Sequence, residues 1–189
     1  MARNTDLRGI NYDKFLYKFL YILSSSELVI IYCMVILTIY YQNIYTAGVL
    51  LLLMNKSAIF GILKKQFIKY NIGKRPKKAF NCNFFNCGGK SISGGMPSGH
   101  MGFMGIIIGI IYNMYKLNNN KTYIYVYLLM VILTGISRYL LKCHTLLQII
   151  MGYVIGILLG YMYYVMDDYL DKNIDYYRYN RSIFYNHFK

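Results

Sequence analysis

Two histidines in this chain stand beside groups that suit phosphate binding. His100 closes the stretch Met96-Pro97-Ser98-Gly99-His100, and His144 follows Ser137-Arg138 after five residues. Arg75, followed by Pro76, lies further upstream in a basic run. Guanidinium groups bind phosphate oxygens through paired hydrogen bonds, and glycine lets backbone N–H groups approach an anion closely. With one histidine to attack phosphorus and the other to protonate the leaving oxygen, these residues predict phosphoryl transfer.

The stretch Pro97-Ser98-Gly99-His100 directly precedes an apolar segment, which predicts the start of a helix. Serine is a good N-cap, and a helix start offers free N–H groups and the positive end of the dipole. Gly94, Gly95 and Gly99 leave room for an anion against the backbone. We therefore expect Ser98 and Gly99 to bind phosphate with His100 in the first turn. The alternative is an ordinary capped helix with an interfacial histidine.

The second motif is predicted to join two apolar segments, with Arg138 ending one and His144 opening the next. Arg138 can hold two phosphate oxygens at once. Gln148 follows His144 by four residues and so shares its helix face. Its side-chain oxygen can accept a hydrogen bond from one ring nitrogen, which leaves the other free to attack phosphorus. The alternative is that His144 is a lone histidine at the interface.

Acidic residues are absent from the part of the chain that holds these candidates. The seven are Asp6, Asp13, Glu27, Asp167, Asp168, Asp171 and Asp175. None lies between Leu28 and Met166, so no pair of carboxylates is predicted there to hold the metal ions of a two-metal phosphatase. We expect a site without metal or other cofactor, in which positive side chains stabilise the phosphate.

The apolar residues, 57% of the chain, come in blocks that indicate an integral membrane protein. The blocks are Leu28–Tyr41, Ile44–Leu63, Met101–Tyr115, Tyr123–Ile136 and Leu146–Met166. They predict an all-α bundle of about five transmembrane helices. Phe15–Leu23 is too short to span and is expected to lie on the membrane surface. The predicted organisation is a polar and interfacial segment (1–27), a transmembrane domain (28–166) and a polar C-terminal tail (167–189).

The order of the blocks brings the motifs together. Loops that follow even-numbered spans lie on the same side of a membrane, so Arg75, His100 and His144 are predicted to meet at one face. The net charge of +14 does not indicate nucleic acid, because the basic residues lie in loops where lipid head groups or a phosphate substrate would meet them. Fourteen lysines and arginines fall on this face and six on the other, which favours a cytoplasmic active face.

The four cysteines do not form a metal signature. Cys82 and Cys87 can pair if their loop faces an oxidising lumen, whereas free thiols are the simpler alternative.

Together these motifs resemble the three-part signature of the type 2 phosphatidic acid phosphatase superfamily. The matching residues are Lys69 with Arg75-Pro76, Pro97-Ser98-Gly99-His100, and Ser137-Arg138-x5-His144. The resemblance implies that His144 is the nucleophile that forms a phosphohistidine and that His100 is the general acid. It also implies phosphate binding by Lys69, Arg75, Ser98, Gly99 and Arg138. The spacing from lysine to arginine is one residue short, which makes Lys65 a rival, and Gln148 replaces the usual aspartate.

The segments Gly95–Met104 and His144–Gln148 are similar to those of dolichyl diphosphate phosphatases, a subfamily in which His-Thr and a glutamine also occur. This similarity implies a polyprenyl diphosphate substrate, a multi-pass location in a membrane like the endoplasmic reticulum, and no nucleic-acid partner. A phosphatidic acid or lysolipid phosphatase is the nearest alternative. An inactive protein that binds or scaffolds lipid phosphates is the alternative from another class, motivated by Gln148 and the short lysine spacing.

Overall fold

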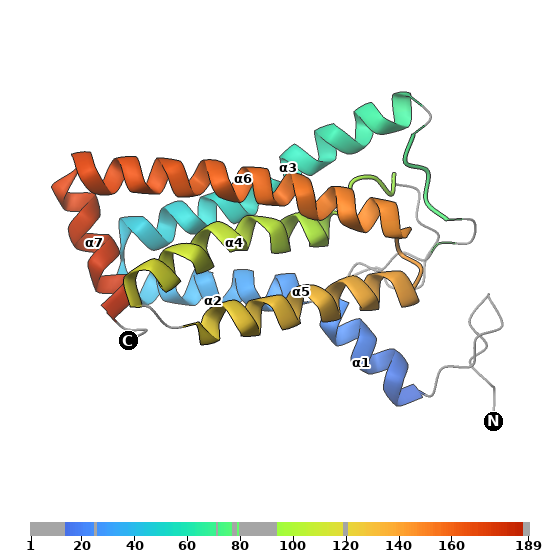
Figure 1. The fold of residues 1–189 in the computed structure, drawn as a ribbon, viewed down its shortest axis with the longest axis horizontal. Helices are drawn as coiled ribbons and strands as arrows, with labels where there is room; N and C mark the ends of the chain where they lie inside the picture. The colour runs from blue at the N-terminus through green and yellow to red at the C-terminus, as the bar shows by residue number, and fades with distance from the viewer. Residues whose placement is uncertain are drawn as a thin grey trace.

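The computed structural model describes residues 14–24, 26–70, 72–76, 79, 94–118 and 121–186. Seven α-helices and no strand occur in this part of the chain. They are α1 (Lys14–Ser24), α2 (Ser26–Tyr41), α3 (Ile44–Lys69), α4 (Gly99–Asn118), α5 (Thr122–Leu140), α6 (Leu146–Asn173) and α7 (Asp175–Asn186). The predicted all-α fold is confirmed. Helices α2 to α6 run alongside one another as an elongated bundle, and α7 folds across one end (Figure 1).

Each predicted apolar block lies inside one of the helices α2 to α6, and the predicted interfacial segment lies inside α1. Polar residues at the breaks between the blocks start the next helix. Asn43 caps α3 by accepting a hydrogen bond from the N–H of Tyr45 (2.7 Å). Thr145 and Gln148 form a capping box at the start of α6, in which each side chain binds the backbone of the other. Hydropathy thus decides where the helices run, and short polar side chains decide where they begin.

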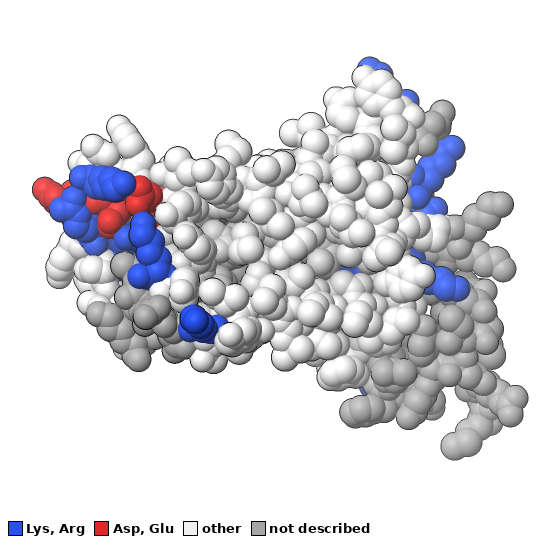
Figure 2. All heavy atoms as spheres, in the orientation of Figure 1, with Lys and Arg blue, Asp and Glu red and all other residues white. Residues whose placement is uncertain are grey.

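The outer surface of the bundle is suited to lipid. Helices α3, α5 and α6 are long and apolar enough to cross a membrane, whereas the 16 residues of α2 extend for about 24 Å. Leu51, Leu129 and Leu158 are each more than half exposed. An apolar surface of this extent is unfavourable in water and fits contact with lipid chains. In Figure 2 the charged side chains gather at the two ends of the molecule, with an uncharged belt between them. The chain is a membrane protein with three candidate spans in its described part, and the number of five stays a prediction.

Helices α4 and α6 touch backbone to backbone. Glycine occurs at every fourth position along the middle of α6, at Gly152, Gly156 and Gly160. A Cβ atom added to Gly156 would lie 2.2 Å from the carbonyl oxygen of Gly102 in α4, and one added to Gly109 would lie 2.3 Å from that of Gly160. Small residues at this spacing let membrane helices approach closely and gain dispersion contacts. This contact fixes the starts of α4 and α6, which carry the two histidine motifs, relative to each other.

A buried polar network closes the end of the bundle where α7 lies. Asp167, fully buried in α6, accepts hydrogen bonds from Asn113 Nδ2 (2.7 Å), Tyr177 Oη (2.6 Å) and Arg181 Nε (3.0 Å). A buried carboxylate is tolerated when it is paired and hydrogen-bonded in this way. Helix α6 continues through residue 167, the predicted start of the polar C-terminal tail, to Asn173, and α7 packs on the bundle. The division of the chain into three segments stays a prediction.

Candidate active site

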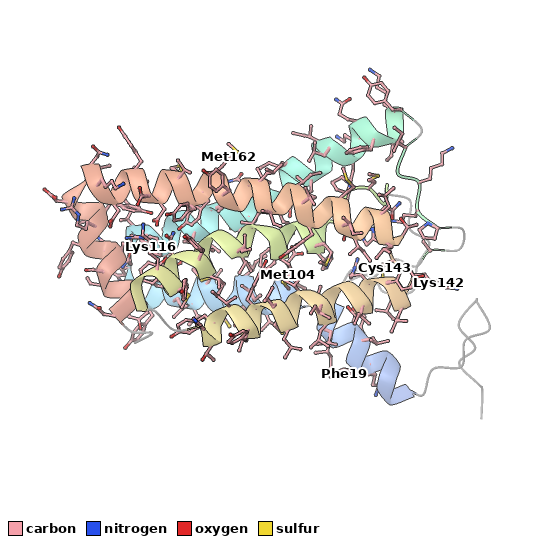
Figure 3. All side chains as sticks on the ribbon, in the orientation of Figure 1. Phe19, Met104, Lys116, Lys142, Cys143 and Met162 are labelled. Atoms are coloured by element: carbon pink, nitrogen blue, oxygen red, sulfur yellow. The ribbon has the colours of Figure 1, made fainter. Side chains whose placement is uncertain are left out.

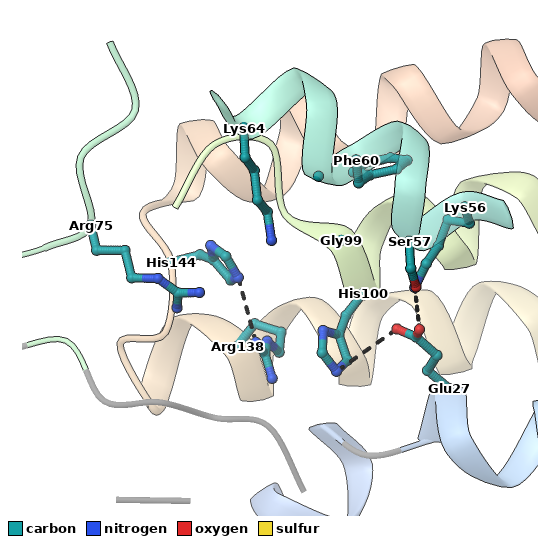
Figure 4. Close-up of a pocket in the computed structure, with 11 residues that line it drawn as sticks. Glu27, Lys56, Ser57, Phe60, Lys64, Arg75, Gly99, His100, Arg138 and His144 are labelled. Atoms are coloured by element: carbon teal, nitrogen blue, oxygen red, sulfur yellow. Dashed lines mark hydrogen bonds and ion pairs between the residues drawn. The ribbon is translucent and has the colours of Figure 1, made fainter. Parts of the chain in front are cut away.

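The histidine and arginine motifs meet at the other end of the bundle. Figure 3 places Cys143, the neighbour of His144, at the end of the molecule opposite Lys116. The C-terminal parts of α3 and α5 and the first turns of α2 and α4 converge there, as does the loop before α6. The pocket is lined by Glu27, Lys56, Ser57, Phe60, Gly61, Lys64, Arg75, Gly99, His100, Arg138 and His144 (Figure 4). The convergence predicted from the order of the apolar blocks is thus present in the structure.

Arg138 and His144 are held together by the short loop between α5 and α6. Both are buried, and Nη2 of Arg138 lies 3.4 Å from Nε2 of His144. The loop is closed by hydrogen bonds from the N–H of Leu141 to Ser137 (2.9 Å) and from that of Cys143 to Arg138 (3.1 Å). A guanidinium can only donate, so Nε2 of His144 accepts and carries a lone pair. That lone pair is directed at Arg138, and both side chains line the pocket.

The surroundings of His144 favour its neutral imidazole. Its burial disfavours the charged imidazolium, and the positive charges of Arg138, Arg75 and Lys64 oppose protonation further. These effects hold the pKa of His144 well below its usual value of 6.5. A neutral imidazole with a lone pair on Nε2 is the form that attacks an electrophilic phosphorus.

Arg75 connects the segment before α4 to the loop that carries His144. Its Nη1 donates to the carbonyl oxygen of Cys143 (2.9 Å), and the guanidinium also lines the pocket. The segment is anchored nearby by a hydrogen bond from the N–H of Gly95 to the carbonyl of Gly73 (2.9 Å). Gly73 has a φ of 88°, which only glycine adopts without cost. Arg75 therefore lines the pocket and fixes the loop that carries His144.

Two lysines line the pocket, Lys56 and Lys64, and neither of the predicted candidates, Lys69 and Lys65, is among them. Lys69 ends α3 and is exposed, as is Lys65. Lys64 points into the pocket, and its Nζ lies 3.8 Å from the place where a Cβ atom of Gly99 would stand. The prediction that Lys69 binds the phosphate is therefore replaced by one for Lys64. Helix geometry is the reason, because only one of these three lysines lies on the face of α3 that looks toward α4 and α5.

Gln148 does not bind the ring of His144 as predicted. Its Oε1 accepts from the N–H of Thr145 (3.1 Å), and its Nε2 donates to the carbonyl oxygen of Lys74 (2.8 Å). Nδ1 of His144 is buried, and a backbone hydrogen bond with Gly95, not one with Gln148, acts on the ring. Gln148 instead caps α6 and holds the backbone next to Arg75.

Ser98 and Gly99 take different places at the start of α4. Gly99 lines the pocket as predicted, whereas Ser98 does not. Ser98 is fully buried against α6, where its N–H donates to the carbonyl oxygen of Gln148 (3.1 Å). Its hydroxyl is buried and lacks a hydrogen-bond partner in the described part of the chain. In this structure Ser98 fixes the start of α4 against α6, and a direct role in phosphate binding stays a prediction.

Three charged residues of the pocket were not singled out as catalytic from the sequence: Glu27, Lys56 and Lys64. Lys56 is the one charged residue inside the apolar block Ile44–Leu63, and an ionisable group in a membrane span is a signal of a functional site. Its Nζ donates to Oε1 of Glu27, which lies in the first turn of α2. Glu27 had no such signal, because it stands just outside the first apolar block. Among the described residues, no group of three His, Cys, Asp or Glu side chains is placed to hold a metal ion.

Two cysteines fall within the described residues. Cys33 is a free thiol, whereas Cys143 is disulfide-bonded. Cys82 and Cys87, for which pairing with each other was one prediction, lie outside the described residues.

The fold and the site define a helical membrane protein with a polar pocket in which two histidines face a group of cations. A sequence model of the PAP2 superfamily matches residues 45–172, which include every residue lining the pocket except Glu27. The chain belongs to the PAP2 superfamily, whose members are phosphatases of lipid or phosphate substrates. The resemblance drawn from the three motifs is thereby confirmed. No curated protein and no solved structure matches the chain.

Proposed function

We propose that this protein is a metal-independent phosphatase that removes phosphate from a lipid phosphate or diphosphate through a phosphohistidine intermediate. One observation carries the proposal: a neutral His144 presents Nε2 to a pocket that also holds Arg138, Arg75 and Lys64. The cations bind and polarise the phosphoryl group, and the imidazole supplies the attacking lone pair. These side chains stabilise the charge that a metal ion stabilises in other phosphatases.

The reaction has two steps. Nε2 of His144 attacks phosphorus in line with the leaving oxygen, so a P–N bond forms while the P–O bond breaks. The electron pair of the broken bond stays on the leaving oxygen, which takes a proton from His100. Water then attacks the phosphohistidine, the P–N bond breaks, and its electron pair returns to Nε2 of His144. His100 takes the proton that the water loses, and inorganic phosphate leaves.

We propose a polyprenyl diphosphate such as dolichyl diphosphate as the substrate, cleaved to the monophosphate and inorganic phosphate. Lys64, Arg75 and Arg138 bring three cations to the pocket besides Lys56, which is paired with Glu27, and this charge fits a head group with two phosphates. Gln148, which distinguishes the chain from the usual aspartate, holds the backbone beside Arg75. That role explains how a glutamine serves this site.

The test is release of inorganic phosphate in detergent with EDTA present. Dolichyl diphosphate and phosphatidic acid are offered side by side, with His144→Ala as the blank. Release from the diphosphate alone would support both mechanism and substrate. Release from phosphatidic acid would keep the mechanism and replace the substrate. Vanadate binding without turnover of either lipid would favour the inactive lipid-phosphate binding protein.

We propose a multi-pass location in a membrane like the endoplasmic reticulum, with the pocket on the lumenal side. The disulfide at Cys143, beside the nucleophile, supports this side because disulfides persist in oxidising compartments. The charge distribution alone favours the opposite orientation, but a phosphate site needs cations for its own reasons. A tag at the C-terminus, on the face opposite the pocket, should be digested by protease added outside sealed microsomes. Protection of that tag would reverse the orientation.

A further inference from the structure

One carboxylate lines the pocket in the described part of the chain, that of Glu27. The residue is 9% exposed and lies in the first turn of α2. Its Oε1 accepts a hydrogen bond from Nζ of Lys56 in α3. Its Oε2 is buried, lies 3.8 Å from Nε2 of His100 and has no hydrogen-bond partner among the described residues (Figure 4). One oxygen is therefore satisfied, and the other is directed at the ring of the proposed general acid.

The surroundings of His100 otherwise disfavour an imidazolium. Arg138 in α5 faces it from one side, Lys56 and Lys64 in α3 face it from another, and His144 lies across the pocket. A general acid must carry a proton when the substrate is bound. Among the described groups that face His100, Glu27 alone brings a negative charge. Its carboxylate thus counteracts the effect of these cations, which disfavour a proton on His100.

We infer that Glu27 is the positioning residue of His100: its Oε2 accepts a hydrogen bond from Nε2–H of the ring and stabilises the protonated form, so that Nδ1 delivers the proton to the leaving oxygen. The inference rests on the proposed phosphatase function. It follows the logic of a carboxylate that orients a histidine and stabilises its imidazolium. The distance of 3.8 Å shortens to a hydrogen bond by a small ring movement, as catalytic contacts commonly do once substrate is bound.

The leaving group separates this role from a structural one. An alkyl or polyprenyl leaving group is strongly basic and needs a proton, whereas a nitrophenolate leaves without one. The quantity to compare is kcat/KM, which reports the steps up to cleavage of the P–O bond. Glu27→Gln keeps the size of the side chain and removes its charge. We expect it to lower kcat/KM for the lipid substrate by about 100-fold more than for p-nitrophenyl phosphate.

Two further variants provide controls. His100→Ala should show the same dependence on the leaving group, and combining it with Glu27→Gln should cost little more, because both act in one step. Glu27→Gln also leaves Lys56 unpaired, and breaking a buried ion pair destabilises a protein strongly. The double variant Glu27→Gln/Lys56→Met removes that unpaired charge. It should recover folding, and its kcat/KM should stay about 100-fold more reduced for the lipid than for nitrophenyl phosphate.

The outcomes distinguish this inference from the proposed function. A wild-type protein that releases phosphate from no substrate would reject the phosphatase function itself. The inference would be overturned if the wild type is active, Glu27→Gln lowers kcat/KM equally for both substrates, and adding Lys56→Met restores both values. In that case Glu27 would serve only to neutralise Lys56. A selective loss with the lipid that persists in the double variant would support the positioning role.

Discussion

Replacing Lys64 gives the sharpest test of the phosphate site, because the structure and the sequence motif name different lysines. Lys64→Met keeps an unbranched apolar stem of similar length and removes the ammonium group. Lys69→Met and Lys65→Met are matched controls on the same helix, and both parent side chains are exposed. The expectation is a loss of phosphatase activity for Lys64→Met alone.

The size of the loss follows from the position of Lys64. Its Nζ stands 3.8 Å from the place of a Gly99 Cβ atom, so it reaches the backbone at the start of α4 where a phosphate would lie. Two unit charges 4 Å apart interact by about 4 kcal/mol at an effective dielectric constant near 20. Desolvation offsets part of this energy, and a hydrogen bond to a charged group contributes about 1.5–3 kcal/mol net. We therefore expect kcat/KM to fall about 10- to 150-fold.

The assay is phosphate release in detergent from the lipid that the wild type cleaves. Vanadate inhibition is measured in parallel, since a weakened phosphate site should bind vanadate less tightly. Size-exclusion profiles of the three variants control for folding. A large loss in Lys69→Met together with wild-type activity in Lys64→Met would refute the assignment, and the motif lysine would have to reach the site in a conformation that differs from this one.

The remaining predictions concern the nucleophile, its pH dependence and its support. His144→Ala should abolish turnover and the acid-labile phosphoenzyme while the protein stays folded, and normal activity would refute the histidine mechanism. The acid limb of kcat/KM should lie below pH 6.5, because the pKa of His144 is depressed and activity is lost only as the pH falls through it; Arg75→Gln, which removes one opposing cation, should move this limb upward. Gln148→Asp and Gln148→Glu should both lower activity, since neither carboxylate donates to the Lys74 carbonyl; wild-type rates in Gln148→Asp would show that this hydrogen bond is dispensable. Gly156→Ala should shift the thermal unfolding of the detergent-solubilised protein downward by several degrees, whereas Gly48→Ala, whose added methyl group meets nothing within 4 Å, should not; equal effects would refute the close packing of α4 and α6.

The arrangement of the helices could be predicted from the sequence because it depends on hydropathy. Five apolar blocks separated by polar residues gave the positions of α2 to α6, and the order of the spans placed Arg75, His100 and His144 at one end. The contact between α4 and α6 was open to prediction too, since glycine at every fourth position in an apolar segment is a known pattern of helix association. The capping box from Thr145 to Gln148 is likewise visible in the sequence.

The finer features of the site depend on which face a helix turns toward its neighbours. The lysine spacing pointed to Lys69, but α3 continues to that residue and turns it outward. The pairing of Glu27 with Lys56 joins two helices whose separation the sequence does not specify. Gln148 was predicted on the same helix side as His144, yet its amide hydrogen-bonds to the backbone of Thr145 and Lys74 instead. Such choices among competing hydrogen-bond partners are decided by tertiary packing.

The glycine contact between α4 and α6 makes the spacing of the two histidines independent of the side chains that face the lipid. His100 stands in the first turn of α4 and His144 directly precedes α6, so both are carried on two backbones in direct contact. Their spacing is set by main-chain atoms, whereas the bulky side chains exposed on α3, α5 and α6 face outward. Those outer side chains can be exchanged to suit a bilayer of another thickness or fluidity while His100 and His144 keep their distance. The same pair of inner helices can therefore serve in membranes of different composition, with changes only at the outer surface.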